Sequence, residues 1–319
     1  MERAESHLED SLNELNGRVN ALEAAGPSVE LMEAYVNRGA VLAMMEYRLA
    51  ALDDLDSAGE ILSSLDPASV DAGTFVKIHT TRAALVFDQG GDPVEEYAIA
   101  ATRLRELRDG SLHFDRRGIV RMCISACENL IDAEHGEDCG PFLERGLAAA
   151  SGSDRWSENR RMDLQCLAAE SADSVNDVRG AMEWYSEAIE TGTRLMESGS
   201  LDDTESLVMA LVLRAGAEAD LGMEEVGVTD LTVAVQLLEG LLEAHGLPDK
   251  EPLIALHHDL AGALMKIGRV EEAEKHLIRA MEIGVGQYAG EVDIDVHLPD
   301  GSRLRRVPNG FIANRHSPS

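Results

Sequence analysis

Lysine, aromatic residues and proline are all scarce in this chain of 319 residues. Only four lysines occur, against 24 arginines, and there are nine prolines. Aromatic residues make up 4% of the chain. The long proline-free stretches are rich in Ala, Leu, Met, Glu and Arg, and this composition favours helices over strands. A hydrophobic share of 45% supports a continuous core and excludes wholesale disorder.

Positive charge is also scarce, and the formal net charge is -31. Nucleic acids and anionic membrane surfaces both need lysine and arginine to neutralise phosphate, so we expect neither as a partner. We interpret the acidic surplus as a solvated, self-repelling surface that keeps a long array soluble.

Long apolar runs are absent from the chain, and cysteines are few. No window approaches the roughly 20 apolar residues that span a bilayer, and the charged N-terminus shows no secretory or lipidation signal. The four cysteines (Cys123, Cys127, Cys139 and Cys166) are few for this length and are typical of reduced thiols. We therefore expect a cytoplasmic protein.

One segment of the second half carries a recognisable repeat pattern. Residues 260–273 read LAGALMKIGRVEEA, and Leu277 and Ala280 follow. The small residues Ala261, Ala273 and Ala280, with Gly268 at a turn, resemble the tetratricopeptide repeat (TPR) pattern, in which small side chains let helix A and helix B cross closely. The same spacing recurs at Gly39–Ala51–Leu55–Ala58, Ala169–Ala181–Tyr185–Ala188 and Ala215–Gly227–Leu231–Ala234.

The repeat is longer than usual. Ala181, Gly227 and Ala273 follow one another at steps of 46 residues, whereas a standard TPR has about 34. Two degenerate copies lie around 74–107 and 117–150, with turns at 90–93 and 134–141. The resemblance is to a long-helix variant of the family and implies an all-α, TPR-like α-solenoid of antiparallel helix hairpins, with about 13 helices.

We expect three regions: an N-terminal orphan helix (1–28), the repeat array (29–290) and a C-terminal β-hairpin with a tail (291–319). The first helix shares Ala-Glu-x-His-Leu with the helix B at 273–277, which indicates a half repeat. Its apolar line (Leu8, Leu12, Leu15, Val19 and Leu22) is also compatible with a short coiled-coil seam. This line predicts either a homodimer through residues 2–24 or contact with Val36 and Leu42 in a monomer. After Gly290 the apolar residues alternate, with a turn at 299–301, which predicts the hairpin.

Few residues have the spacing of a catalytic or metal site. Cys123, Cys127, His135 and Cys139 could bind zinc, but without a C-x-x-C pair we favour two small core residues followed by a solvated acidic loop. The His257-His258 pair lacks the spacing that puts two histidines on one helix face, so we favour a core or groove histidine. The nucleophile-elbow, Walker and Rossmann motifs are absent from the sequence. We therefore expect no metal, no cofactor and no enzymatic activity.

The TPR resemblance implies that the inner face of the helices A forms a groove for a partner. The positions that it places there are Val36, Asn37, Ala40, Met44, Met209, Val212, Gly216, His258, Asp259, Gly262 and Met265. The alternative is that the methionines only fill the core. We predict an adaptor or scaffold that binds a protein or peptide segment, with a regulatory receptor for a small peptide or metabolite as the alternative. The family's carboxylate clamp is not expected, because Val36 and Ala40 occupy its first-repeat positions.

Overall fold

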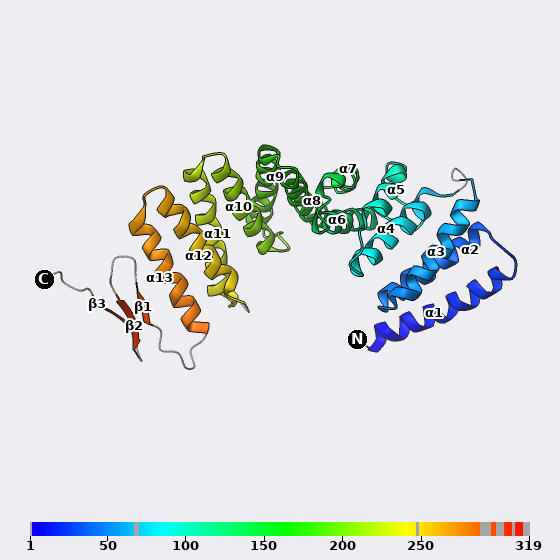
Figure 1. Cartoon of the computed structure of the whole chain (residues 1–319), viewed down its shortest axis with the longest axis horizontal. Coiled ribbons are helices and arrows are strands. Elements are labelled where there is room, and N and C mark those ends of the chain that lie inside the picture. Colours follow the sequence, from blue (N-terminus) through cyan, green and yellow to red (C-terminus); the bar gives the residue numbers. More distant parts are fainter. Residues whose placement is uncertain are drawn as a thin grey trace. The chain divides into compact units, whose positions relative to one another are not determined.

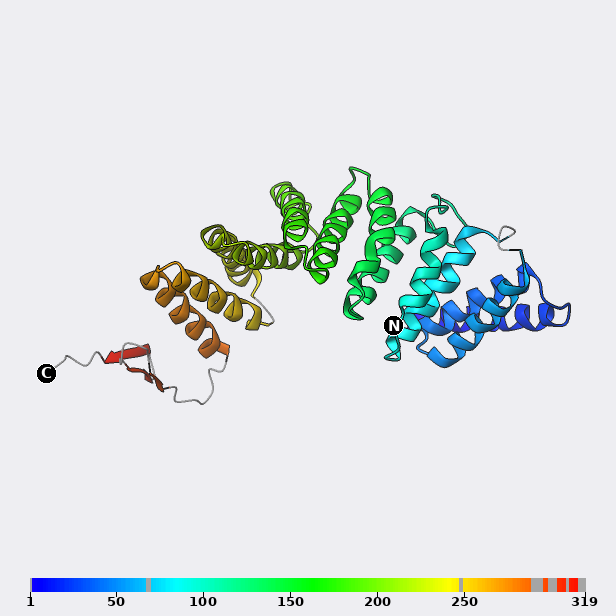
Figure 2. The ribbon, with the colours of Figure 1, turned by 45° about the horizontal axis from the view of Figure 1, so that its top comes forward.

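The computed structural model describes residues 2–66, 70–246 and 249–287, together with three strands farther along the chain. It divides into two compact units, Met1–Gly222 and Met223–Ser319. The described residues form 13 α-helices, as the sequence predicted, and the helices of each unit follow one another in chain order (Figures 1 and 2).

Unit 1 contains the first ten α-helices and the 3₁₀ helix η2. They are α1 (Glu2–Glu23), α2 (Val29–Met44), α3 (Arg48–Ser64), α4 (Ala72–Asp88), α5 (Val94–Leu104), α6 (Arg116–Asp132), the 3₁₀ helix η2 (Gly136–Cys139), α7 (Gly140–Ala149), α8 (Arg155–Ser174), α9 (Val178–Glu197) and α10 (Thr204–Asp220). Helix α2 packs on α3, α4 on α5, α6 on α7, and α8 on both α9 and α6.

Unit 2 contains α11 (Glu224–His245), α12 (Glu251–Lys266) and α13 (Val270–Gln287), and α12 packs on both of the others. The strands β1 (Asp295–His297), β2 (Arg303–Val307) and β3 (Gly310–Asn314) pair antiparallel in that order. Much of the region 291–319 lies outside the described residues, so the predicted hairpin and its domain boundary stay predictions.

Aspartates at helix starts account for part of the acidic surplus. The helices α4, α6, α8, α9 and α10 each begin after an aspartate whose carboxylate accepts a hydrogen bond from a backbone N–H of the first turn. These caps satisfy donors that the helix itself leaves open, and each stabilises its helix by about 1 kcal/mol. Glycines with positive φ, such as Gly90 and Gly268, form the predicted turns.

The small residues of the repeat pattern lie where helices cross. A Cβ added to Gly39 of α2 would lie 3.2 Å from the carbonyl oxygen of Ala51 on α3. Ala51, Ala181 and Ala273, which share one repeat position, are each at most 1% exposed. The register predicted from the sequence is therefore confirmed at these junctions.

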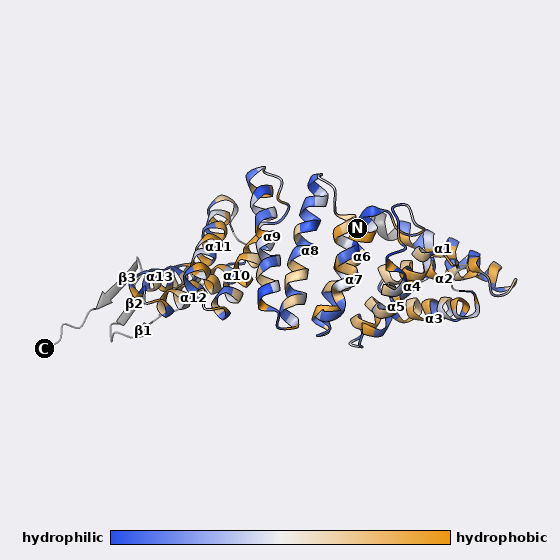
Figure 3. Cartoon of the chain, turned by 90° about the horizontal axis from the view of Figure 1, so that it is seen from above, coloured by the Kyte–Doolittle hydropathy of each residue, from blue (hydrophilic) through white to orange (hydrophobic). Residues whose placement is uncertain are grey.

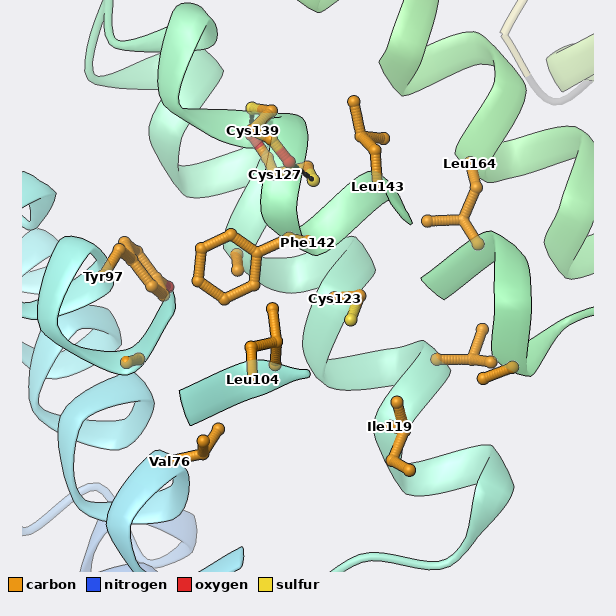
Figure 4. Close-up of a cluster of buried hydrophobic side chains, with 14 of the residues drawn as sticks. Val76, Tyr97, Leu104, Ile119, Cys123, Cys127, Cys139, Phe142, Leu143 and Leu164 are labelled. Atoms are coloured by element: carbon orange, nitrogen blue, oxygen red, sulfur yellow. Dashed lines mark hydrogen bonds between the residues drawn. The ribbon is translucent and has the colours of Figure 1, made fainter. Parts of the chain in front are cut away.

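The largest continuous core of unit 1 joins α4 through α8. At its centre Phe142 contacts Tyr97 edge-on, with the ring centroids 5.5 Å apart (Figure 4). Cys123, Cys127 and Cys139 are fully buried in the same cluster. The interpretation of Cys123 and Cys127 as small core residues is confirmed.

Helix α1 is covered within the chain itself. Val19 is fully buried in a cluster with residues of α2, and Leu22 packs against that cluster. Leu12 packs against a second cluster that contains Leu42. Three of the five residues in the apolar line of α1 thus pack within their own chain. The homodimer through residues 2–24 stays a prediction.

Ala51→Leu tests the close approach of α2 and α3. The extra methyl groups would meet the backbone that passes Gly39, so we expect a loss of about 1–3 kcal/mol in the free energy of unfolding. Ala50→Leu is the matched control, because Ala50 is exposed on the same helix. Urea unfolding followed by circular dichroism compares the two; equal stabilities would contradict the crossing.

Candidate functional site

The predicted groove residues are mostly on the surface. Met44, Met209 and Met265 are 69%, 55% and 50% exposed, so these methionines do not fill the core. Gly216, His258 and Asp259 are exposed, and Asn37, Ala40, Val212 and Gly262 are partly exposed. Val36 is the exception: it is 1% exposed and belongs to the core cluster under α1, so its assignment to the groove is wrong.

These residues fall in both units. Those up to Gly216 lie in unit 1, and His258, Asp259, Gly262 and Met265 lie in unit 2. Among them, Met209 borders a hollow of about 350 Å³ within unit 1.

This α6–α8–α10 hollow is lined by the helices A of three successive hairpins and by one residue of α9. Its lining residues are Ile124, Glu128, Arg160, Asp163, Cys166, Leu167, Glu170, Tyr185, Asp203, Ser206, Met209, Ala210 and Leu213. The contributions from α8 recur every three or four residues, which places them on one face of that helix. Helix α8 carries both hydrophilic and hydrophobic residues along its length (Figure 3).

Carboxylates dominate the charge of the hollow. Glu128, Asp163, Glu170 and Asp203 line it, and Arg160 is the one basic side chain among its lining residues. Arg160 is already engaged, since its Nη1 lies 2.7 Å from Oδ2 of Asp163. Its Nη2 lies 3.8 Å from Oδ2 of Asp202 at the rim.

Two of these carboxyl groups bind their protons more tightly than usual. Burial raises the pKa of Asp163 to about 6, although Arg160 opposes the shift, and nearby carboxylates such as Asp203 raise it further. Burial also raises the pKa of Glu170, and the charges of Asp132, Glu128 and Asp173 add to that effect. The hollow therefore holds negative charge that its surroundings compensate poorly.

Cys166 has no features of a nucleophile. Burial raises the pKa of its thiol to about 12, and the neighbouring Asp163 and Glu170 raise it further. A thiol in such a site stays protonated, and it is the thiolate that reacts.

The structure does not bring together the four residues that the sequence offered as a possible zinc site. Cys127 and Cys139 face each other's backbone, with the Sγ of Cys139 3.7 Å from the carbonyl oxygen of Cys127. Among the described residues, the group of potential ligands that converges in this region is His135, Glu137 and Asp138, which contains no cysteine. These three are at least partly exposed, and His135 also lies 3.3 Å from Oδ2 of Asp92.

The histidine pair of unit 2 points in two directions, as predicted. His258 is exposed, whereas His257 is 2% exposed. The Nδ1 of His257 lies 3.0 Å from Nδ1 of His276, and its Nε2 lies 3.1 Å from Oε1 of Glu239. Arg279 binds the same carboxylate. Burial lowers the pKa of His257, although Glu239 opposes this, so a neutral ring is favoured in the folded state.

Similar solved structures identify the fold. BtubC (BKLC) from P. vanneervenii is 17% identical with a TM-score of 0.54, over 79% of this chain and 95% of that one. A putative kinesin light chain of Podospora anserina with TPR-like repeats is 14% identical with a TM-score of 0.51, over 69% and 100% of the two chains. The C-terminal part of a TPR repeat-containing protein from Cytophaga hutchinsonii is 11% identical with a TM-score of 0.51, over 87% and 98%.

No protein-family model and no curated protein sequence matches this chain. At the identities of the solved structures, the likeness establishes the architecture: the chain is a TPR-like α-solenoid. No helix among the described residues is long and apolar enough to cross a membrane.

Sequence reasoning found Met209 but missed the carboxylates around it. A usable signal was present on α8, where Arg160, Asp163, Leu167 and Glu170 are spaced three, four and three residues apart. The number of acids predicts a solvated surface, and the spacing alone does not distinguish a half-buried acidic face from an exposed one.

Asp163→Asn should stabilise unit 1 at neutral pH. The folded state raises the pKa of Asp163, so it holds a proton that the unfolded chain releases, and stability falls as pH rises from about 4 to about 6. The neutral amide avoids this loss. We expect a gain of about 2 kcal/mol at about pH 7.5 that shrinks towards about pH 4. Urea unfolding measures it; Glu183→Gln on the exposed side of α9 is the control, and a pH-independent difference would contradict the assignment.

The His257 cluster should make unit 2 sensitive to acid. Below its ordinary pKa of about 6.5, the unfolded chain takes up a proton that the buried ring resists, so stability is lost as pH falls. Hydrogen exchange of α12, corrected for intrinsic rates, should show less protection at about pH 5.5 than at about pH 7.5. His257→Gln should reduce that difference. An unchanged difference would assign the acid sensitivity to other groups.

Proposed function

We propose that this chain is a non-enzymatic, cytoplasmic adaptor that binds a segment of a partner protein in the α6–α8–α10 hollow. The observation that carries the proposal is that the exposed Met209, the partly buried Ile124 and Leu213, and four carboxylates line one hollow between three helices. A surface of this kind suits an extended or helical segment, which needs apolar anchors and a few directing polar contacts.

Met209 is the central residue of the proposal. It is 55% exposed at the edge of the hollow, beside Ala210 and Leu213 of the same helix. Methionine is flexible and polarizable, so it adapts to partner side chains of different shape. Its exposure has a cost in water that burial against a partner would remove.

A non-catalytic role is consistent with the chemistry of the hollow. Its thiol is held protonated, and Arg160 is engaged by Asp163. Burial raises the carboxyl pKa values of Asp163 and Glu170, and the Ser206 hydroxyl already donates a hydrogen bond to Asp203.

A receptor for a small peptide or metabolite is the second candidate. A hollow of about 350 Å³ lies within the range of about 300–1,000 Å³ that is typical of small-ligand sites. The two candidates differ in what co-purifies with the protein from a cell extract. The adaptor retains a partner protein, and the receptor retains a small molecule.

Met209→Glu tests the adaptor. The tagged full chain is used to capture partners from native lysate, and mass spectrometry identifies what is bound. We expect a discrete partner protein with the unchanged chain and none with Met209→Glu, because the new carboxylate adds charge to an apolar contact in an acidic hollow. Met196→Glu, on an exposed site of α9, is the matched control and should retain the partner.

Two results would contradict the adaptor. Partner capture that survives Met209→Glu would move the site elsewhere on the chain. A small molecule that is lost with Met209→Glu, without any partner protein, would favour the receptor.

A further inference from the structure

We infer that the segment held in the α6–α8–α10 hollow presents an arginine or lysine side chain next to an apolar one. This inference rests on the proposed binding of a protein segment at the hollow and names the chemistry of that segment. It follows from the charges, the apolar lining and the spacing of the carboxylates.

The charges of the hollow favour a cation. Four carboxylates line it against one guanidinium, and that guanidinium is already bound to Asp163. The carboxylates come from three helices of different hairpins: Glu128 from α6, Asp163 and Glu170 from α8, and Asp203 at the start of α10. A segment with an acidic side chain would be repelled from every side, whereas a basic one would supply the missing counter-charge.

The apolar lining favours a cation on a long aliphatic stem. Ile124, Leu167 and Leu213 lie in the same hollow as the carboxylates. Lysine and arginine pack their methylene groups on apolar surface and keep the charged group among polar atoms. The exposed Met209 at the edge would then contact the apolar neighbour of the basic residue.

The spacing of the carboxylates disfavours a bare metal ion. Among the described residues, the group whose ligand atoms lie within 4.8 Å of one another is His135, Glu137 and Asp138, and the carboxylates of the hollow do not form such a group. Divalent cations need several oxygen ligands that converge on one point. A guanidinium or ammonium group can instead bind separated carboxylates through its several N–H donors.

The protonation of the hollow agrees with this chemistry. The raised pKa of Asp163 indicates that water and Arg160 together do not fully compensate its charge in the folded state. A bound cation would favour the ionised form, so its affinity should rise as pH increases through about 6.

A random-peptide library displayed on phage and selected on the full-length chain tests the inference. Individual selected peptides are then synthesised and titrated by fluorescence anisotropy. The hollow variant combines Glu128→Gln, Asp163→Asn and Glu170→Gln. The matched control combines Glu183→Gln, Glu190→Gln and Glu197→Gln. The control removes the same number of charges from exposed positions of α9. Circular dichroism confirms that both variants are folded.

We expect the selected peptides to be enriched in arginine or lysine beside an apolar residue. Their affinity should fall about tenfold or more in the hollow variant and about twofold or less in the control, because close charge pairs contribute far more than distant ones. If the hollow variant does not fold, Glu128→Gln alone replaces it, and it should weaken binding more than Glu183→Gln alone does.

The outcomes separate the inference from the proposed function. Peptides that lose affinity with Met209→Glu but lack basic residues, or that bind the hollow variant and the unchanged chain equally, would overturn the inference and leave the adaptor standing. Failure to select any peptide that depends on Met209 would overturn both. Where the single substitutions are used, equal affinities for Glu128→Gln and Glu183→Gln would also overturn the inference.

Discussion

The close approach of helix backbones at small residues is the constraint on which the rest of this structure depends. An added Cβ would lie 3.2 Å from the Ala51 carbonyl oxygen at Gly39, 2.9 Å from Leu164 at Gly146, and 2.7 Å from Met162 at Gly192. The contacts at Gly39 and Gly192 lie within the α2–α3 and α8–α9 hairpins, and the contact at Gly146 joins α7 to α8 of the next hairpin. Because each junction depends only on contacts between neighbouring helices, a long array can be assembled from local contacts.

This constraint also explains why the hollow lies where it does. Helix α8 contacts its own helix B, α9, and also α6 and α7 of the preceding hairpin, so the hollow lies on its remaining face. On α8 that face carries Asp163 and Glu170, whose charged forms the fold disfavours. Residues that lower stability in their ionised state, grouped in a hollow, are more typical of a binding site than of a structural surface.

Local spacing predicted the helices and their crossings, because the small residues, turn glycines and caps that determine them all lie within the sequence of one hairpin. Ala51, Ala273 and the turn at Gly90 illustrate this. Val36 was misplaced because the orphan helix α1 covers that part of α2. The acidic lining was missed because aspartate also caps helices, as Asp154 and Asp177 do, so the number of acids does not locate a site. The convergence of α6, α8 and α10 depends on packing between hairpins, which repeat spacing does not specify.

The acidic surplus therefore acts over two different distances. The net charge of -31 attracts any cation, but salt screens it beyond about 8 Å at physiological ionic strength, so it raises encounter rates without selecting a partner. In the α6–α8–α10 hollow, Asp163 and Glu170 are partly buried, so salt screens them much less, and Ile124, Leu167 and Leu213 line the same hollow. A segment bound there must supply both a basic side chain for the carboxylates and an apolar side chain for the apolar lining. Selectivity between basic partners would then depend on how well the apolar neighbour of the basic residue fits against Met209, since the distant charges treat all basic segments alike.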